Sequence, residues 1–121
     1  MMYRYDIPGI PPSNNKYIGR NVHWEYQKVK KQWAALINLE CRPKPPKPLE
    51  KAVLQLIYHF PDNRRRDPDN YSGKMILDGL VRAGLIADDC FSCLDLQLAA
   101  VYDKGGFTEI FVEENNLENK Y

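Results

Sequence analysis

The fold is decided by residues 52–84, which read AVLQLIYHFPDNRRRDPDNYSGKMILDGLVRAG. Apolar side chains alternate along 52–60, which is the pattern of a strand with one buried face. A proline ends this strand. Pro68 suits the first turn of a helix with Asp67 as its cap, and Gly84 suits the left-handed residue that closes a helix. The stretch therefore predicts a strand that leads through a polar turn into a helix.

The segments on either side extend this pattern. Residues 94–102 alternate again, and Lys104-Gly105-Gly106 is a hairpin signal that predicts pairing with a strand over 107–112. Upstream, we expect an edge strand over 3–7 and an amphipathic helix over 22–40, where apolar residues recur at helical spacing. The order β-α-β-α-β-β predicts an α+β fold, a small mixed sheet with its helices packed on one face.

The composition is that of one globular domain spanning 1–121. The chain has 121 residues, of which 44% are hydrophobic and 27% are charged, which is ordinary globular usage. No apolar run approaches the ~20 residues that a membrane span needs, and the first residues lack the apolar core of a signal peptide. Three cysteines cannot all pair within one chain, which favours a reducing compartment. We expect a cytoplasmic protein with no membrane partner.

Charge is divided unevenly along the chain. Residues 1–84 hold 15 lysines and arginines against 8 acidic residues, whereas residues 85–121 hold 2 against 8. A basic portion joined to an acidic one suits a protein that holds a phosphate backbone on one surface. A solvated, lysine-rich helix and loop would give the same balance. Charge alone leaves both interpretations open.

The densest ionisable cluster is residues 64–70, which read RRRDPDN. Asp67 and Asp69 lie two apart in a turn, where both can face one point and supply oxygen ligands to Mg²⁺. Such an ion lowers the pKa of a bound water and neutralises charge on a phosphodiester, and the preceding arginines would hold the phosphates. Helix capping explains the same carboxylates equally well. The pair Asp88-Asp89 favours the metal interpretation, because it has no evident capping duty.

Other metal and cofactor motifs fail on spacing. An EF-hand loop starting at Asp67 would need glycine where Ser72 stands. A zinc site at Cys90-Phe91-Ser92-Cys93 lacks a second paired set of ligands, so two small residues flanking a turn are the better interpretation. The sequence has no glycine-rich phosphate loop, dinucleotide fingerprint or Ser-His-Asp grouping. We therefore expect no nucleotide cofactor.

The central motif is Asp-x-Asp-Asn, preceded by arginines and followed by a lysine and an Asp-Asp pair. It closely resembles the motif of the RusA family of Holliday junction resolvases. Here it consists of Arg64-Arg65-Arg66-Asp67-Pro68-Asp69-Asn70, Lys74 and Asp88-Asp89. The run 11–17, PPSNNKY, and the turn at 104–106 also match, so the resemblance covers nearly the whole chain. It implies a homodimeric, Mg²⁺-dependent endonuclease that nicks four-way DNA junctions symmetrically, with a phage or prophage setting.

Carried over by position, the resemblance assigns the site residues. The metal ligands would be Asp67, Asp69 and Asp89, with Asp88 beside them, and Mn²⁺ is an alternative to Mg²⁺. The catalytic residues would be Asp67, Asp69 and Asp89 together with Lys74, which would stabilise the transition state. For contacts to DNA we expect Arg64, Arg65, Arg66, Lys16, Arg20 and Asn70.

Two features of spacing bear on this assignment. Three residues separate the Asp-x-Asp-Asn motif from Lys74, where we expect two. One extra residue rotates a helix by about 100°, unless the helix begins only after Gly73. A helix over 70–83 is also roughly 21 Å long, whereas extended residues 84–89 return at most ~18 Å. We expect one subunit to supply the whole site, the alternative being that the partner subunit's Asp89 completes it.

The sequence thus predicts an Mg²⁺-dependent endonuclease that resolves four-way junctions in recombination and repair. Two alternatives remain open. One is a protein that binds junctions without cutting them, and the other is a nuclease for flaps or other branched DNA. Metal-dependent cleavage of junction, flap and linear duplex separates the three.

Overall fold

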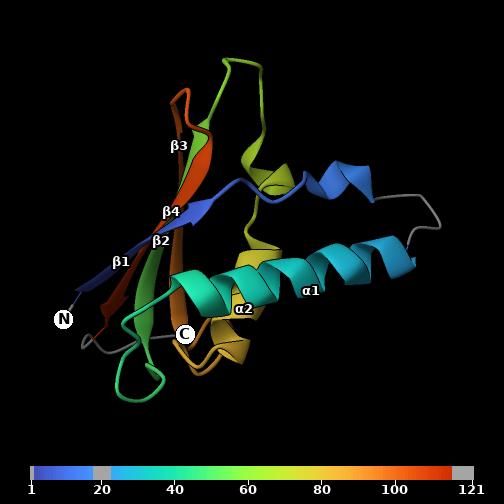
Figure 1. The fold of residues 1–121 in the computed structure, drawn as a ribbon. Coiled ribbons are helices and arrows are strands. Elements are labelled where there is room, and N and C mark those ends of the chain that lie inside the picture. The colour runs from blue at the N-terminus through green and yellow to red at the C-terminus, as the bar shows by residue number, and fades with distance from the viewer. Residues whose placement is uncertain (1, 18–22, 116–121) are drawn as a thin grey trace.

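The computed structural model of the chain describes residues 2–17 and 23–115 (Figure 1). Its elements follow the predicted β-α-β-α-β-β order, with two short 3₁₀ turns between them. In chain order they are β1 (Met2–Pro8), η1 (Asn14–Lys16), α1 (His23–Glu40), β2 (Ala52–Phe60), η2 (Pro68–Asn70), α2 (Lys74–Arg82), β3 (Leu94–Tyr102) and β4 (Phe107–Glu114). The predicted α+β fold class is confirmed.

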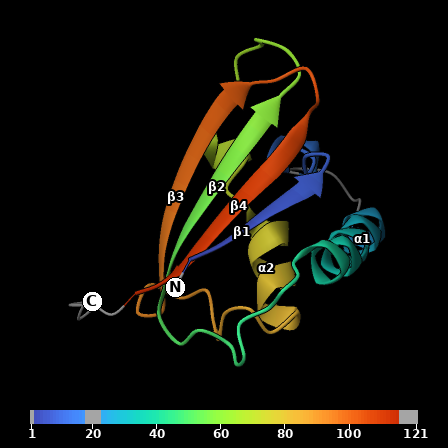
Figure 2. The same cartoon turned by 60° about the vertical axis from the view of Figure 1, so that its left-hand side comes forward.

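The four strands form one mixed sheet in the order β1-β4-β2-β3. Both helices cover the same face of this sheet, as predicted (Figure 2). Strand β2 is central, with β4 antiparallel on one side and β3 parallel on the other. Its alternate residues from Ala52 to Phe60 are all buried. This is the face that the alternating sequence pattern predicted.

The predicted hairpin between residues 94–102 and 107–112 is wrong. The turn itself forms, with the Gly106 N–H donating to the Asp103 carbonyl, but β2 lies between β3 and β4. The Asp103 N–H donates to the Phe60 carbonyl, so the turn crosses the end of β2. The most apolar strand gains a partner on each side in this arrangement, and a Gly-Gly turn signal does not encode which strand is the neighbour.

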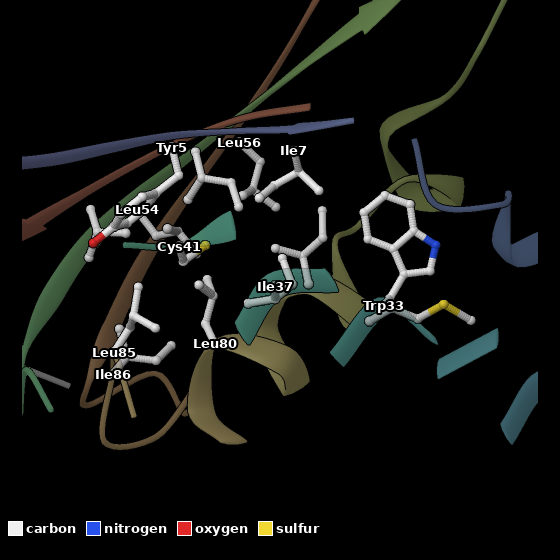
Figure 3. Packing of buried hydrophobic residues seen from close by; sticks show 14 of the residues in the cluster. Tyr5, Ile7, Trp33, Ile37, Cys41, Leu54, Leu56, Leu80, Leu85 and Ile86 are labelled. Carbon is white, nitrogen blue, oxygen red and sulfur yellow. The ribbon is translucent and has the colours of Figure 1, made fainter. Parts of the chain in front are cut away.

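The hydrophobic core lies between the sheet and the two helices (Figure 3). From α1, Trp33 and Ile37 point toward the sheet, where Ile7 and Leu56 meet them. Leu80 of α2 is completely buried in the same cluster. The thiol of Cys41 is also enclosed, and its burial raises the pKa to about 12. That cysteine therefore behaves as an apolar core residue.

On the sheet face that the helices leave open, a charged network spans β1, β4 and β2. The Nε of Arg4 donates to the Glu109 carboxylate at 2.6 Å, and Nε2 of His59 lies 3.0 Å from the other oxygen of that carboxylate. Burial disfavours the charged form of Glu109, but the hydrogen bonds from His59 and Arg4 outweigh it and lower the pKa. His59 also stacks on Phe107 at 3.9 Å between ring centroids. The network ties three strands together across this face.

The helix predicted to begin at Pro68 begins later. Pro68–Asn70 form only the 3₁₀ turn η2, and Gly73 then takes a left-handed φ of 84° before α2 starts at Lys74. The extra residue of the motif is thus absorbed outside the regular helix. Neither helix of the described residues is long and apolar enough to cross a membrane.

We predict that Gly73→Ala lowers the free energy of unfolding by about 2–4 kcal/mol. A side chain at this φ is strained, and its Cβ would collide with Cδ1 of the buried Leu56. The matched control is Gly84→Ala, which has a φ of 82° and no atom within 4 Å of the new Cβ. It should lose only about 1–2 kcal/mol. Urea unfolding measures both, and equal losses would refute the close approach at Gly73.

Candidate functional site

The motif segment turns back over the helix side of the sheet after β2 ends. A cavity of about 150 Å³ is lined by Arg66, Asp67, Pro68 and Tyr71, together with Tyr58 and Phe60 of β2 and residues 98–100 of β3. The ring of Tyr71 packs edge-on against both Tyr58 and Phe60. Asp67 is therefore held beside the carboxyl-terminal halves of two parallel strands.

The three arginines of the motif differ in their surroundings. Arg64 and Arg65 are 79% and 89% exposed, whereas Arg66 is only 13% exposed. The guanidinium of Arg66 lies over the Phe60 ring at 4.1 Å and donates to the carbonyls of Asp62 and Arg64. Arg66 is thus a clamp for the loop, and Arg64 and Arg65 are the arginines that project into solvent.

Asp62 organises the start of the same loop. Its carboxylate lies 2.9 Å from Nη1 of Arg66 and accepts from the Arg64 backbone N–H. The hydrogen bond from Arg66 and that from the Arg64 backbone lower the pKa of Asp62 to about 2. This carboxylate therefore remains charged at neutral pH.

The predicted capping role of Asp67 can be checked in the structure, and the surroundings of Asp69 can be described beside it. Asp67 occupies the N-cap position of η2, but its side chain makes no capping hydrogen bond. It accepts instead from the exposed Nε of Arg65 at 3.3 Å. Among the described residues, no hydrogen bond or ion pair engages the exposed Asp69 carboxylate. Both carboxylates are open to solvent, which favours the metal interpretation over capping.

The N-terminal motif supports this loop from outside. Nδ2 of Asn14 donates to the Asp69 carbonyl at 3.0 Å and to Oγ of Ser72 at 3.1 Å. Two segments more than fifty residues apart in sequence are thereby joined beside the carboxylates. Lys16, at the end of η1, is 4.0 Å from Glu25 and remains half exposed. Arg20 lies outside the described residues.

Lys74 lies at the first turn of α2, one turn beyond the carboxylates. Its Nζ is 3.7 Å from the Asp78 carboxylate, which Lys30 of α1 also approaches at 3.4 Å. Lys74 is 64% exposed, so it reaches solvent while paired with Asp78. Asn70 is half-buried at the end of η2 and donates its backbone N–H to the Asp67 carbonyl. Among the described residues, neither side chain forms a hydrogen bond or ion pair with the Asp67 or Asp69 carboxylate.

Asp88 and Asp89 lie at the opposite end of the sheet, which corrects the expectation that one subunit supplies the whole site. The parallel register pairs Ala52 with Leu94, so the segment before β3 sits beside the start of β2, whereas residues 61–70 follow its end. From Leu94 to Ala100, which lines the cavity beside Asp67, the strand rises roughly 20 Å. In Figures 1 and 2, the short yellow-green turn η2 lies beyond the upper end of α2, and the gold-orange segment before β3 lies at the lower end of that helix.

No cluster of three metal-ligating side chains occurs in one chain, over the residues described. Asp88 accepts a hydrogen bond from the Asp89 backbone N–H at 2.8 Å, and both side chains are exposed. The following Cys90-Phe91-Ser92-Cys93 forms a turn, with the two thiols 3.3 Å apart. This agrees with the interpretation of small residues flanking a turn.

Sequence reasoning missed the cavity beside Asp67. Its aromatic wall comes from Tyr58, Phe60 and Tyr71, and its far side comes from β3. Alternation marked Tyr58 and Phe60 only as core positions, and it did not extend to Tyr71. The sequence signal that could have indicated this cavity was Phe60, a hydrophobic residue at the end of a strand and next to a polar loop. The packing of Arg66 on Phe60 could not be foreseen, because it depends on how the loop turns back.

Comparison with known proteins leaves the chain without an assigned family. No model of a protein family matches it, and no curated protein matches it either. The likeness to the RusA motif therefore rests on the residues quoted above.

We predict that Arg66→Ala lowers the free energy of unfolding by about 1–2 kcal/mol, through loss of the contact with Phe60 and of the hydrogen bonds to Asp62. Arg65→Ala is the matched control, since its side chain is the most exposed of the three, and it should change stability by less than about 0.5 kcal/mol. Thermal and urea unfolding supply the measurement. Equal stability of the two variants would rule out the clamp.

Proposed function

We propose that this protein is a Mg²⁺-dependent endonuclease that acts on branched DNA, with the four-way junction as its preferred substrate. The observation that carries the proposal is the placement of Asp67 and Asp69. They are two solvent-open carboxylates without capping duties, held on a braced loop beside two exposed arginines. We propose the four-way junction as the substrate because the whole motif resembles that of RusA-type resolvases.

The donor set at this loop fits a hard divalent cation. Mg²⁺ is commonly held by one or two carboxylates, with water and substrate phosphate completing its octahedron. When bound, the ion lowers the pKa of a water molecule and stabilises charge on the phosphodiester. Asp67 and Asp69 would hold it, and the Asn14 hydrogen bond to the Asp69 carbonyl would fix the backbone from which one carboxylate projects.

The arginines would hold the DNA backbone at the same place. Arg64 and Arg65 are exposed beside the carboxylates, and Lys16 is brought to the same side because η1 contacts η2. Contacts of this kind bind phosphates without reading sequence, and they weaken as salt rises. Arg66 would contribute indirectly, by fixing the loop on Phe60.

A junction-binding protein that does not cut is the second candidate function. The observation that favours it is the pairing of Lys74 with Asp78, one turn away from the carboxylates. Such a protein would bind junctions equally well with and without Mg²⁺ and leave them intact.

We predict that the purified protein nicks a labelled mobile four-way junction with Mg²⁺ and not with EDTA. Asp69→Asn should reduce cleavage by at least ~10²-fold, because it removes a ligand from a site with few carboxylates. Asp69→Asn leaves the arginines unchanged, so the variant should still bind the junction. Denaturing gels of junction, flap and linear duplex provide the readout, with Asp6→Asn on the edge strand β1 as a control carboxylate outside the loop. Tight binding without cleavage in any metal would establish the second candidate instead.

A further inference from the structure

We infer that Cys90 and Cys93 form a thiol–disulfide exchange site, which is oxidised by small disulfides that carry no negative charge. The site lies at the end of the sheet away from Asp67. It goes beyond the proposed nuclease function, because no step of the exchange uses a metal ion or DNA.

The turn before β3 holds the two thiols in contact. Sγ of Cys90 is 3.3 Å from Sγ of Cys93. The Cys93 N–H and the Leu94 N–H both donate to the Cys90 carbonyl at 3.0 Å, which closes a β-turn between the cysteines. The Cα atoms at the two ends of a β-turn lie within about 7 Å, and a disulfide needs roughly 4.4–6.8 Å between them. The backbone therefore already has the closure that the bond requires.

The rest of the fold fixes this turn on both sides. The Ala87 N–H donates to the Leu49 carbonyl, and the Ala52 N–H donates to the Cys93 carbonyl, both at 2.9 Å. These bonds tie the segment to the start of β2, and Cys93 leads directly into β3. The contact between the thiols thus belongs to the folded chain, whereas the same residues separate freely when the chain unfolds.

The three cysteines differ in accessibility, which sets the order of reaction. Cys90 is exposed, Cys93 is half-buried and Cys41 is completely buried in the core. A small disulfide therefore reaches Cys90 first, and Cys93 is the thiol close enough to complete the exchange. Oγ of Ser92 lies 3.1 Å from Sγ of Cys90, where its hydroxyl can donate to the sulfur as the proton leaves.

The exchange consists of two balanced substitutions at sulfur. Cys90 loses its proton to water and attacks one sulfur of the small disulfide, and the other half leaves as a thiolate that takes up a proton. Cys93 then loses its proton and attacks the Cys90 sulfur, which releases the second half in the same way. The two protein thiols are oxidised to a disulfide, and the small disulfide is reduced to two thiols. An excess of small thiols reverses both steps, so the site responds to the ratio of disulfide to thiol.

Charge selects the disulfide that the site accepts. Asp88 and Asp89 directly precede Cys90, and both side chains are exposed. Two negative charges beside the reacting sulfur repel an anionic disulfide and attract a cationic one. The preferred oxidants are therefore neutral or cationic.

The pairing of the thiols is tested by mass spectrometry, without reference to DNA cleavage. The reduced protein is incubated with cystamine, a cationic disulfide, and quenched with acid. The wild type should lose two hydrogen atoms and retain no cysteamine, and so should Cys41→Ala. Cys93→Ser should instead retain one cysteamine at Cys90, while Cys90→Ser should react more slowly because Cys93 is less exposed. A wild type that retains cysteamine, or one that stays reduced, overturns the inference.

The contribution of the fold is measured as the equilibrium constant for oxidation in mixtures of cystamine and cysteamine. We expect this constant to be at least about tenfold larger for the native protein than for the chain unfolded in urea, because only the folded turn holds the two sulfurs in contact. Circular dichroism checks the folded and unfolded states. Equal constants would overturn the role of the turn.

The charge preference is tested with two disulfides of similar length, cationic cystamine and anionic dithiodipropionate. The ratio of their rate constants should fall at least about threefold in the Asp88→Asn, Asp89→Asn variant. The intrinsic reactivity of the two reagents cancels, because the same pair is compared in both proteins. An unchanged ratio overturns the charge preference, and the mass result decides the disulfide by itself.

Discussion

The parallel, in-register pairing of β2 with β3 is the constraint on which the rest of the structure depends. Parallel neighbours need a crossover, and α2 provides it by running back across the sheet. The crossover places the segment that leaves β2 at one end of the sheet and the segment that enters β3 at the other. The two acidic pairs of the motif belong to these two segments, so their separation follows from the topology.

The loop between β2 and α2 is a rigid platform made from few interactions. Arg66 packs on Phe60 and is fixed by Asp62, and Asn14 joins the far side of the loop to the N-terminal motif. Gly73 then admits the left-handed turn that lets α2 begin at Lys74. These contacts leave Asp67 and Asp69 to project into solvent instead of serving as caps. Polar side chains exposed on a fixed backbone are the usual starting point for ligand binding.

The elements could be predicted from sequence because alternation and helical spacing are local signals. Residues 52–60 and 94–102 were predicted with the bounds that the structure shows. The strand order was beyond such signals, since the turn at Gly105 and Gly106 specifies a reversal of the chain and not the strand that lies beside it. The start of α2 differs from the predicted one for a similar reason, since it too depends on contacts between distant segments. Pro68 and Asp67 signalled a helix start, but the close approach of Gly73 to Leu56 decided it.

The sequence could predict which residue types form the candidate site. It could not predict where each of them lies in the folded chain. The motif predicted Asp67 and Asp69 as metal ligands, and the structure shows both side chains exposed. The packing of Arg66, in contrast, depends on an aromatic ring that only the folded chain brings beneath it. The position of Asp89 depends on sheet topology. An extended-chain estimate showed that its reach to Asp67 was short, and the parallel register explains why.

The most direct test of this account is whether the loop that carries Asp67 and Asp69 binds a divalent metal ion. Mn²⁺ would be added to the isotope-labelled wild type and, as a control, to the Asp67→Asn, Asp69→Asn variant. The account predicts that the backbone amides of residues 67 and 69 broaden in the nuclear magnetic resonance spectrum of the wild type, at a Mn²⁺ concentration that leaves the same amides of the variant sharp. Sharp signals at residues 67 and 69 in the wild type, or equal broadening in the two proteins, would contradict it.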